Sequence, residues 1–201
     1  MPKTMPKSPR EGLTAAKVFR FLSLPFRPDR LKAYRSVDRF VDIAIAPLLA
    51  DGIRGVLLDA DGTLAPHHSQ AFSPAVMEHV HEMTAAGLKV AIFTNANDDR
   101  FEQFQGVSVV TGVPAKPDPR GFLTAMRKHL GLDDPKAVCM IGDNYITDGG
   151  AISAGMRFIH VRPLPGPEKW AHRTLRAAAY YLARLYHPRP ENQRKAPCEH
   201  P

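Results

Sequence analysis

From residue 53 onward, short apolar runs alternate with segments of helical periodicity, and this alternation restricts the fold more than any other feature of the sequence. The runs are apolar throughout, which indicates strands buried on both faces. Strands separated by helices pair in parallel through right-handed crossovers. We therefore expect an α/β fold, a doubly wound parallel sheet with helices on both faces. Strands are predicted over residues 53–59, 89–94, 107–111, 137–142 and 158–161.

The segments between these runs carry start and stop signals of helices. Ser73 and Pro74 supply an N-cap and a first-turn proline, and Gly87 ends that helix. Gly131 is expected to end another. The remaining helices are predicted over residues 98–104, 122–130, 149–154 and 168–187.

Charge is unevenly distributed along the 201 residues. Residues 1–39 carry ten basic and three acidic side chains, residues 40–161 nine and fourteen, and residues 162–201 eight and three. A formal net charge of +7 could suggest nucleic-acid binding, but the positive charge belongs to the two ends. No nucleic acid is therefore expected as a partner.

Four regions are expected along the chain: a basic N-terminal segment (1–39), an α/β core (40–166), a C-terminal helix (167–187) and a tail (188–201). Residues 1–16 and 188–201 are rich in proline and charge without periodicity, which predicts disorder. Cys139 and Cys198 lie far apart and suggest neither a disulfide framework nor a thiolate metal site. The apolar run 18–26 is too short for a membrane span. We expect a cytoplasmic protein, either free or in peripheral contact with the inner face of a membrane.

Acidic residues follow the first and fourth predicted strands. Asp59 and Asp61 end the first, and Asp143 and Asp148 follow the fourth. Ligand sites of doubly wound sheets lie beyond the carboxyl ends of the strands, so these carboxylates should converge. Crowded carboxylates without histidine or cysteine favour a hard cation, and Mg²⁺ is the expected cofactor. The other candidate site residues at this edge are Gly62, Thr94, Asn95, Lys116 and Asn144.

These motifs resemble those of the haloacid dehalogenase superfamily of phosphatases. Its four motifs occur in order, as the run 59–63, Thr94, Lys116 and the run 142–148. The runs 115–117, 142–148 and 161–164 are also similar to the YqeG-type branch, which resembles phosphatidylglycerophosphate phosphatases. Gly62 and Thr94 depart from that branch, which usually has asparagine and more often serine there. The resemblance covers residues 53–162 and implies a Mg²⁺-dependent phosphomonoesterase.

The resemblance implies a role for each group. Asp59 would ligate the metal, attack phosphorus and form an aspartyl-phosphate. Asp61 would act as general acid and base, and would ligate the metal through its backbone carbonyl. Asp143 would complete the metal site. Asp148 would orient metal-bound water or Lys116 from behind the metal ligands, and Asn144 is expected in the same outer layer.

The remaining groups would bind the phosphate. Thr94 and Asn95 would contact it, and Lys116 would neutralise its charge as the transition state forms. Gly62 would allow backbone amides to approach it. Thr94 and Asn95 could also cap a helix, and Asp148 could cap the helix after it.

Other chemistry-bearing residues are expected to have no catalytic role. The spacing of His67, His68, His79 and His81 fits no zinc-ligand pattern, so surface positions are predicted for them. Trp170 and the tyrosines of the last helix are expected to pack against the core rather than to stack on bases.

Neither interval between motifs has room for a cap domain, since residues 64–93 and 96–115 are each used by one helix and one strand. An open site favours a large or surface-held ester, such as a lipid phosphate like phosphatidylglycerophosphate. Residues 17–39 interleave aromatic and basic side chains, which fits either an anchor on an anionic membrane or a segment packed on the sheet. A soluble sugar-phosphate or nucleotide phosphatase covered by oligomerisation remains an alternative, and a non-catalytic phosphate-binding scaffold is a second.

Overall fold

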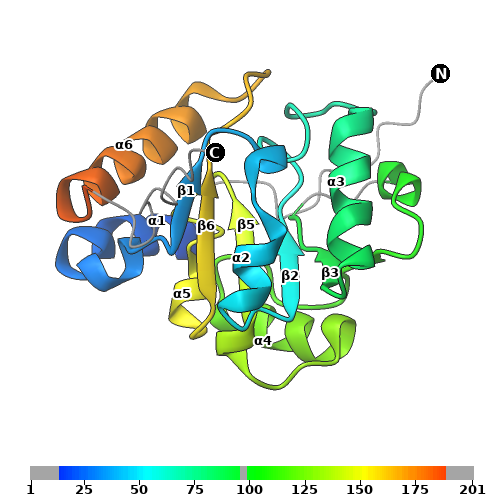
Figure 1. The fold of residues 1–201 in the computed structure, drawn as a ribbon. Helices are drawn as coiled ribbons and strands as arrows, with labels where there is room; N and C mark the ends of the chain where they lie inside the picture. Colours follow the sequence, from blue (N-terminus) through cyan, green and yellow to red (C-terminus); the bar gives the residue numbers. More distant parts are fainter. Residues whose placement is uncertain (1–13, 96–98, 189–201) are drawn as a thin grey trace, which may run out of the picture.

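A computed structural model describes residues 14–95 and 99–188. Its centre is a six-stranded, all-parallel sheet in the order β1-β6-β5-β2-β3-β4 (Figure 1). The predicted doubly wound α/β fold is confirmed. The strands are β1 (Arg35–Val37), β2 (Gly55–Leu58), β3 (Lys89–Ile92), β4 (Ser108–Val109), β5 (Val138–Gly142) and β6 (Arg157–Val161).

Helices cover both faces of the sheet (Figure 1). The α-helices are α1 (Ala15–Ser23), α2 (Ile45–Ala50), α3 (Pro74–Ala85), α4 (Pro119–Ala125), α5 (Gly150–Ser153) and α6 (Trp170–Tyr186). Shorter 3₁₀ turns occupy Leu24–Phe26, Pro28–Leu31, Phe40–Asp42, Asp99–Gln103 and Pro135–Ala137, and a π-helical turn, Met126–Leu130, continues α4. Ser73 caps α3 through a bond from the Val76 amide to its hydroxyl, as predicted. Gly131 ends the π turn at φ +59°, also as predicted.

Strand β1 is a sixth strand where five were predicted. It pairs in parallel with β6, with Arg35 opposite Ile159. It is only three residues long, begins with Arg35 and is followed by Asp38, so it shows no apolar run. The boundary expected at residue 39 therefore does not separate two structural units.

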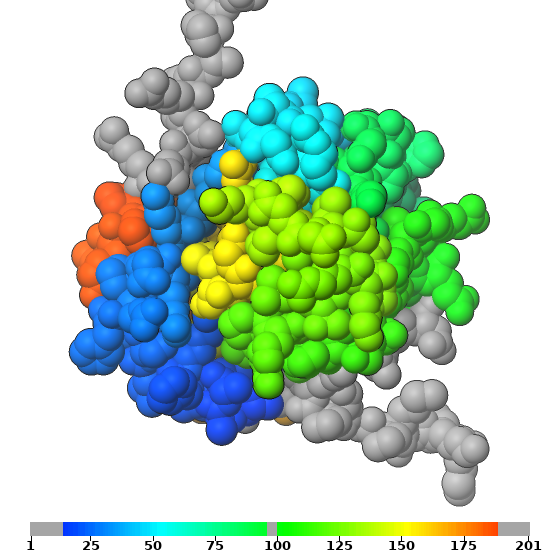
Figure 2. All heavy atoms as spheres, turned by 90° about the horizontal axis from the view of Figure 1, so that it is seen from below, coloured from blue at the N-terminus to red at the C-terminus, as the bar shows by residue number. Residues whose placement is uncertain are grey.

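The N-terminal segment packs on the core rather than extending from it. Leu24 and Leu31 are fully buried. Arg20 donates to the carbonyl oxygen of Gly149 at 2.6 Å and to the hydroxyl of Ser153 at 3.1 Å, which ties α1 to α5. Figure 2 shows this blue segment beside the yellow residues of α5. The disorder predicted for residues 1–16 and 188–201 concerns mainly residues outside those described, but α1 already begins at Ala15.

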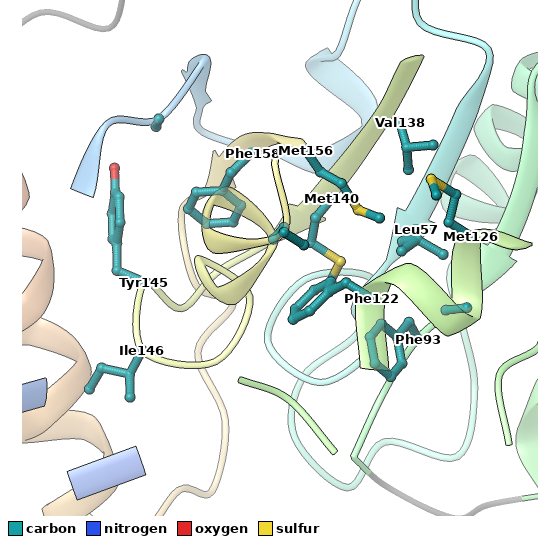
Figure 3. Packing of buried hydrophobic residues seen from close by; sticks show 14 of the residues in the cluster. Leu57, Phe93, Phe122, Met126, Val138, Met140, Tyr145, Ile146, Met156 and Phe158 are labelled. Atoms are coloured by element: carbon teal, nitrogen blue, oxygen red, sulfur yellow. The ribbon is translucent and has the colours of Figure 1, made fainter. Parts of the chain in front are cut away.

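Two hydrophobic clusters lie on opposite faces of the sheet because alternate side chains of each strand point to opposite sides. Leu57 of β2 belongs to one cluster, and Val56 and Leu58 belong to the other. The first cluster includes Met140, Phe122 and Phe158 of the labelled side chains (Figure 3). In the described residues, apolar side chains thus cover both faces of the sheet, and polar groups gather at the ends of the strands.

The outer residues of α6 differ from expectation. Trp170, Tyr181 and Leu185 are 75%, 70% and 75% exposed, so the packing predicted for Trp170 and Tyr181 is wrong. Ala179 and Ala183 are buried in the first hydrophobic cluster, where α6 contacts the turn Pro28–Leu31, and Tyr180 packs against the same cluster as predicted.

His79 is also not a surface residue as predicted. It is buried, lies edge-on to the Phe40 ring at a centroid distance of 5.2 Å, and has its Nδ1 3.0 Å from Glu82. Phe40 belongs to the 3₁₀ turn Phe40–Asp42, which the sequence did not predict and which packs against α3.

Candidate active site

Strand β2 delivers Asp59 to the carboxyl edge of the sheet. Asp59 directly follows Leu58, and its amide donates to the carbonyl oxygen of Ile141 on β5 at 2.9 Å, which continues the ladder one residue beyond the strand. Its side chain is only 11% exposed. The backbone therefore fixes the position of a buried carboxylate.

Lys116 is the centre of the site. Its Nζ lies 2.6 Å from Oδ1 of Asp59 and 2.6 Å from Oδ1 of Asp148. The Lys116 amide donates to Oδ1 of Asn95 at 3.1 Å, and Nδ2 of Asn95 donates back to the Lys116 carbonyl oxygen at 3.3 Å. Asn95 therefore holds the backbone of the lysine, a contact the sequence did not indicate, while Thr94 lies buried beside it in the chain.

The loop after β5 directs Asp148 inward. One oxygen of its side chain accepts from Lys116, and the other accepts from the amide of Asn144 at 3.1 Å. The side-chain oxygen of Asn144 accepts from the Ile146 amide at 2.9 Å, which tightens the same loop. The N-cap of α5 is Gly149, so Asp148 supports Lys116 rather than capping that helix.

Residue 62 must be a glycine, because a side chain at this position would collide with Asp143. Its φ is +83°, and a Cβ there would lie 2.7 Å from Oδ2 of Asp143. The Gly62 amide donates to the carbonyl oxygen of Ala65 at 2.8 Å, so this N–H is already engaged within the loop. The glycine thus lets the loop approach Asp143 closely.

Two arginines that the sequence did not single out belong to this edge. Arg100 donates from Nη2 to Oδ1 of Asp61 at 2.8 Å and from Nη1 to the Ser69 carbonyl oxygen at 2.6 Å. Arg176 of α6 contacts Asp143 through Nη1 and Glu168 through Nη2, the latter at 2.7 Å. No local pattern reveals either pair, since the partners of Asp61 and Asp143 are 39 and 33 residues away.

Burial and mutual repulsion disfavour ionisation of the carboxyls. Burial, with Asp148 nearby, raises the pKa of Asp59 to about 7, although Lys116 acts in the opposite direction. Burial likewise raises the pKa of Asp143 to about 7 against the effect of Arg176, and it raises the pKa of Asp148. Burial alone would lower the pKa of Lys116, but Asp148 and Asp59 hold it above its usual value. Lys116 is therefore a permanent cation among carboxyls that need a further positive charge.

Asp59, Asp143 and Asp148 form a group that could hold a metal ion. Each offers one carboxylate oxygen, and these oxygens lie within 4.8 Å of one another. The set contains only hard oxygen donors, which suit a cation such as Mg²⁺ better than zinc. The side chain of Asp61 is outside this group and is held by Arg100 instead.

The chain is similar to known hydrolases over much of its length. Residues 65–155 match the family model of haloacid dehalogenase-like hydrolases. "Probable phosphatase YqeG" of Bacillus subtilis (strain 168) is 30% identical over 128 residues, covering 59% of this chain and 71% of that protein.

Solved structures share the fold. One crystal structure is 12% identical and covers 67% of this chain and 84% of the other, with a TM-score of 0.50. The crystal structure of a dehalogenase is 18% identical and covers 71% of this chain and 99% of the other, with a TM-score of 0.48. At these sequence identities the similarity concerns the fold alone, and the structure with the TM-score of 0.50 is the one that supports it.

Proposed function

The chain belongs to the haloacid dehalogenase-like hydrolases and is a phosphatase of the YqeG type, and from that premise we propose that it hydrolyses a phosphomonoester with Mg²⁺ through an aspartyl-phosphate on Asp59. The observation that carries this proposal is the buried Lys116 ammonium, 2.6 Å from both Asp59 and Asp148. A fixed cation beside a carboxylate nucleophile can stabilise the negative charge of a phosphoryl group in transfer.

The charges at the site support a divalent cation. Three separate groups of ion pairs at this edge contain five carboxyls and three basic side chains, a net charge of −2 when all are ionised: Asp59 and Asp148 with Lys116, Asp61 with Arg100, and Asp143 and Glu168 with Arg176. One Mg²⁺ would balance this charge and would lower the pKa of the carboxyls that hold it. Asp59 and Asp143 would be its side-chain ligands, and when bound it would neutralise phosphoryl oxygens.

The proposed reaction has two displacements. A carboxylate oxygen of Asp59 forms a bond to phosphorus while the bond from phosphorus to the ester oxygen breaks, and Asp61 gives its proton to the departing oxygen. Asp61 then accepts a proton from a water molecule that attacks phosphorus, which releases phosphate and restores Asp59. Arg100 holds Asp61 in place, and Thr94 and Lys116 bind the phosphoryl oxygens.

We also propose a lipid phosphate, such as phosphatidylglycerophosphate, as the substrate. Within residues 14–95 and 99–188 no additional domain interrupts the order of helices and strands after β2. An ester that is held at a surface does not need to be enclosed by a cap.

Peripheral contact with an anionic membrane would present such a substrate. Val18, Phe19, Leu22 and Phe26 are 36%, 75%, 61% and 82% exposed, and we call them the apolar ridge. The ridge belongs to the N-terminal segment, residues 1–39, which carries a net positive charge. This charge favours contact with anionic lipid. None of the described helices has the length and apolar character required to cross a membrane.

Phosphate release with Mg²⁺, compared between the unaltered chain and Asp59→Asn, tests the reaction. We expect loss of at least about a thousandfold in kcat for Asp59→Asn, since the nucleophile is removed. Asp133→Asn is the matched control, because that side chain is 96% exposed. Turnover by Asp59→Asn at the rate of the control would exclude the nucleophile assignment. A panel of lipid phosphates, sugar phosphates and nucleotides tests the substrate.

Sedimentation with vesicles tests the membrane contact. We expect Phe19→Ser with Leu22→Ser to reduce binding to phosphatidylglycerol vesicles at least tenfold, because each buried apolar side chain contributes about 1.5–3 kcal/mol. Met77→Ser is the control, since Met77 is 37% exposed on α3. Equal sedimentation of the double variant and the control in low salt would contradict the contact.

A further inference from the structure

The carboxyl edge of the sheet holds a cavity beside the proposed phosphate site. It has a volume of about 740 Å³ and lies between the ends of β1 and β6 and one side of α6. Asp143 is part of its wall and also part of the oxygen cluster with Asp59. A ligand whose phosphoryl group lies at that cluster can therefore extend into the cavity past Asp143.

The cavity wall carries aromatic side chains and charges of both signs, the acidic ones being Asp38, Asp143 and Glu168. Tyr180, Tyr181, Arg162 and Arg173 line it. Arg173 forms no ion pair with any other residue of the ranges 14–95 and 99–188. Arg162 lies 3.9 Å from Asp38, but both side chains are largely exposed, so water screens that pair.

Arg176 lies in the cavity wall beside Asp143. Its charge is used by Asp143 and Glu168, and its side chain is 10% exposed. Asp143 and Glu168 are paired with Arg176, and Asp38 lies near Arg162, so among the described residues Arg173 is the cavity-lining cation that is left for an anionic ligand.

We infer that this cavity receives the leaving group of the phosphomonoester and favours a leaving group that carries a negative charge of its own. The inference rests on the proposed function. The volume lies in the range of pockets that hold small organic ligands. In this chain the C-terminal helix α6, which lies beside β1 (Figure 1), would thus select the substrate from one side of an open site.

A pair of matched esters tests the charge preference. The leaving groups of 4-carboxyphenyl phosphate and 4-carbamoylphenyl phosphate have similar shape but differ in charge. We expect Arg173→Gln to raise KM for the carboxyphenyl ester threefold to tenfold, with less than a twofold change in KM for the carbamoyl ester. Arg127→Gln, at an arginine that is 60% exposed on the π turn, is the control and should change neither value.

A bulky side chain tests the location. Ala177 lines the cavity, whereas Ala178 is exposed on the same helix and does not. We expect Ala177→Trp to raise KM at least fivefold for both aryl esters and to affect acetyl phosphate, which has a small leaving group, much less. Ala178→Trp should act on none of them.

The outcomes separate the inference from the function on which it rests. If Arg173→Gln and Ala177→Trp match their controls while acetyl phosphate is hydrolysed, the leaving group does not occupy the cavity and the phosphatase mechanism stands. If the unaltered chain with Mg²⁺ hydrolyses neither aryl ester nor acetyl phosphate, both the proposed function and the inference are overturned.

Discussion

The ammonium group of Lys116 lies 2.6 Å from a carboxylate oxygen of Asp148, a residue with no exposed surface. The same ammonium group lies 2.6 Å from Asp59. Two carboxyls from different strand ends therefore share one buried cation, and this arrangement has consequences for activity and for stability.

Replacement of Asp148 by asparagine should lower kcat about 10- to 100-fold, the usual cost of removing a partner that orients a catalytic group. The carboxylate orients Lys116 and also accepts from the Asn144 amide. Phosphate release at saturating substrate measures the effect, and circular dichroism verifies folding. If kcat of Asp148→Asn equals that of Asp133→Asn, the support of Lys116 by Asp148 is not needed for turnover.

Replacement of Arg176 by alanine should reduce the free energy of unfolding of the metal-free protein by about 3–5 kcal/mol, because buried Asp143 loses its partner. Arg173→Ala on the same helix should change it by less than about 0.5 kcal/mol. Urea denaturation at pH 8 measures both. Equal midpoints for the two variants would refute the importance of the buried pair.

The stability of the metal-free protein should depend on pH through its buried carboxyls. Burial raises the pKa of Asp59 and Asp143 to about 7, above the value of about 4 in an unfolded chain. The folded state therefore binds more protons between about pH 4 and pH 7, and this contribution to stability is lost as the pH rises through 7. His160, whose pKa burial lowers to about 4, acts in the opposite sense below about pH 6.5.

Urea midpoints of the unaltered chain and of Asp143→Asn, measured with a chelator from pH 6.5 to pH 8, isolate the carboxyl effect. The midpoint of the unaltered chain should fall relative to that of the variant across this range, and Mg²⁺ at pH 8 should restore it. A constant difference between the two proteins would show that Asp143 does not titrate there.

Leu24→Ala should destabilise the protein by about 2–5 kcal/mol, because it leaves a cavity in the cluster beneath the N-terminal segment. Leu22→Ala, two residues away but 61% exposed, should change stability by less than about 0.5 kcal/mol. Thermal or urea denaturation compares them. A similar effect of both substitutions would mean that the segment does not pack as described.

The predicted strands that carry the catalytic motifs are present because each is a buried apolar run, a signal that is local in the sequence. Lys89–Ile92 and Val138–Gly142 lie within the ranges expected for them. The contact between Lys116 and Asp148 was also among the expected roles, because the ends of parallel strands meet at one edge. Strand β1 gave no such signal, since its three residues are stabilised by pairing with β6 rather than by their own pattern.

The sequence alone determined the order of strands and helices in the core and the carboxylates that converge at the strand ends, since both follow from short-range periodicity and from the geometry of parallel sheets. Only the tertiary structure decided which cations neutralise Asp61 and Asp143, because Arg100 and Arg176 lie 39 and 33 residues from their partners. It also decided that Leu24 is buried while Leu22 is exposed. Such choices depend on the packing of segments that are distant in the chain, and the free energy of that packing is absent from any local pattern.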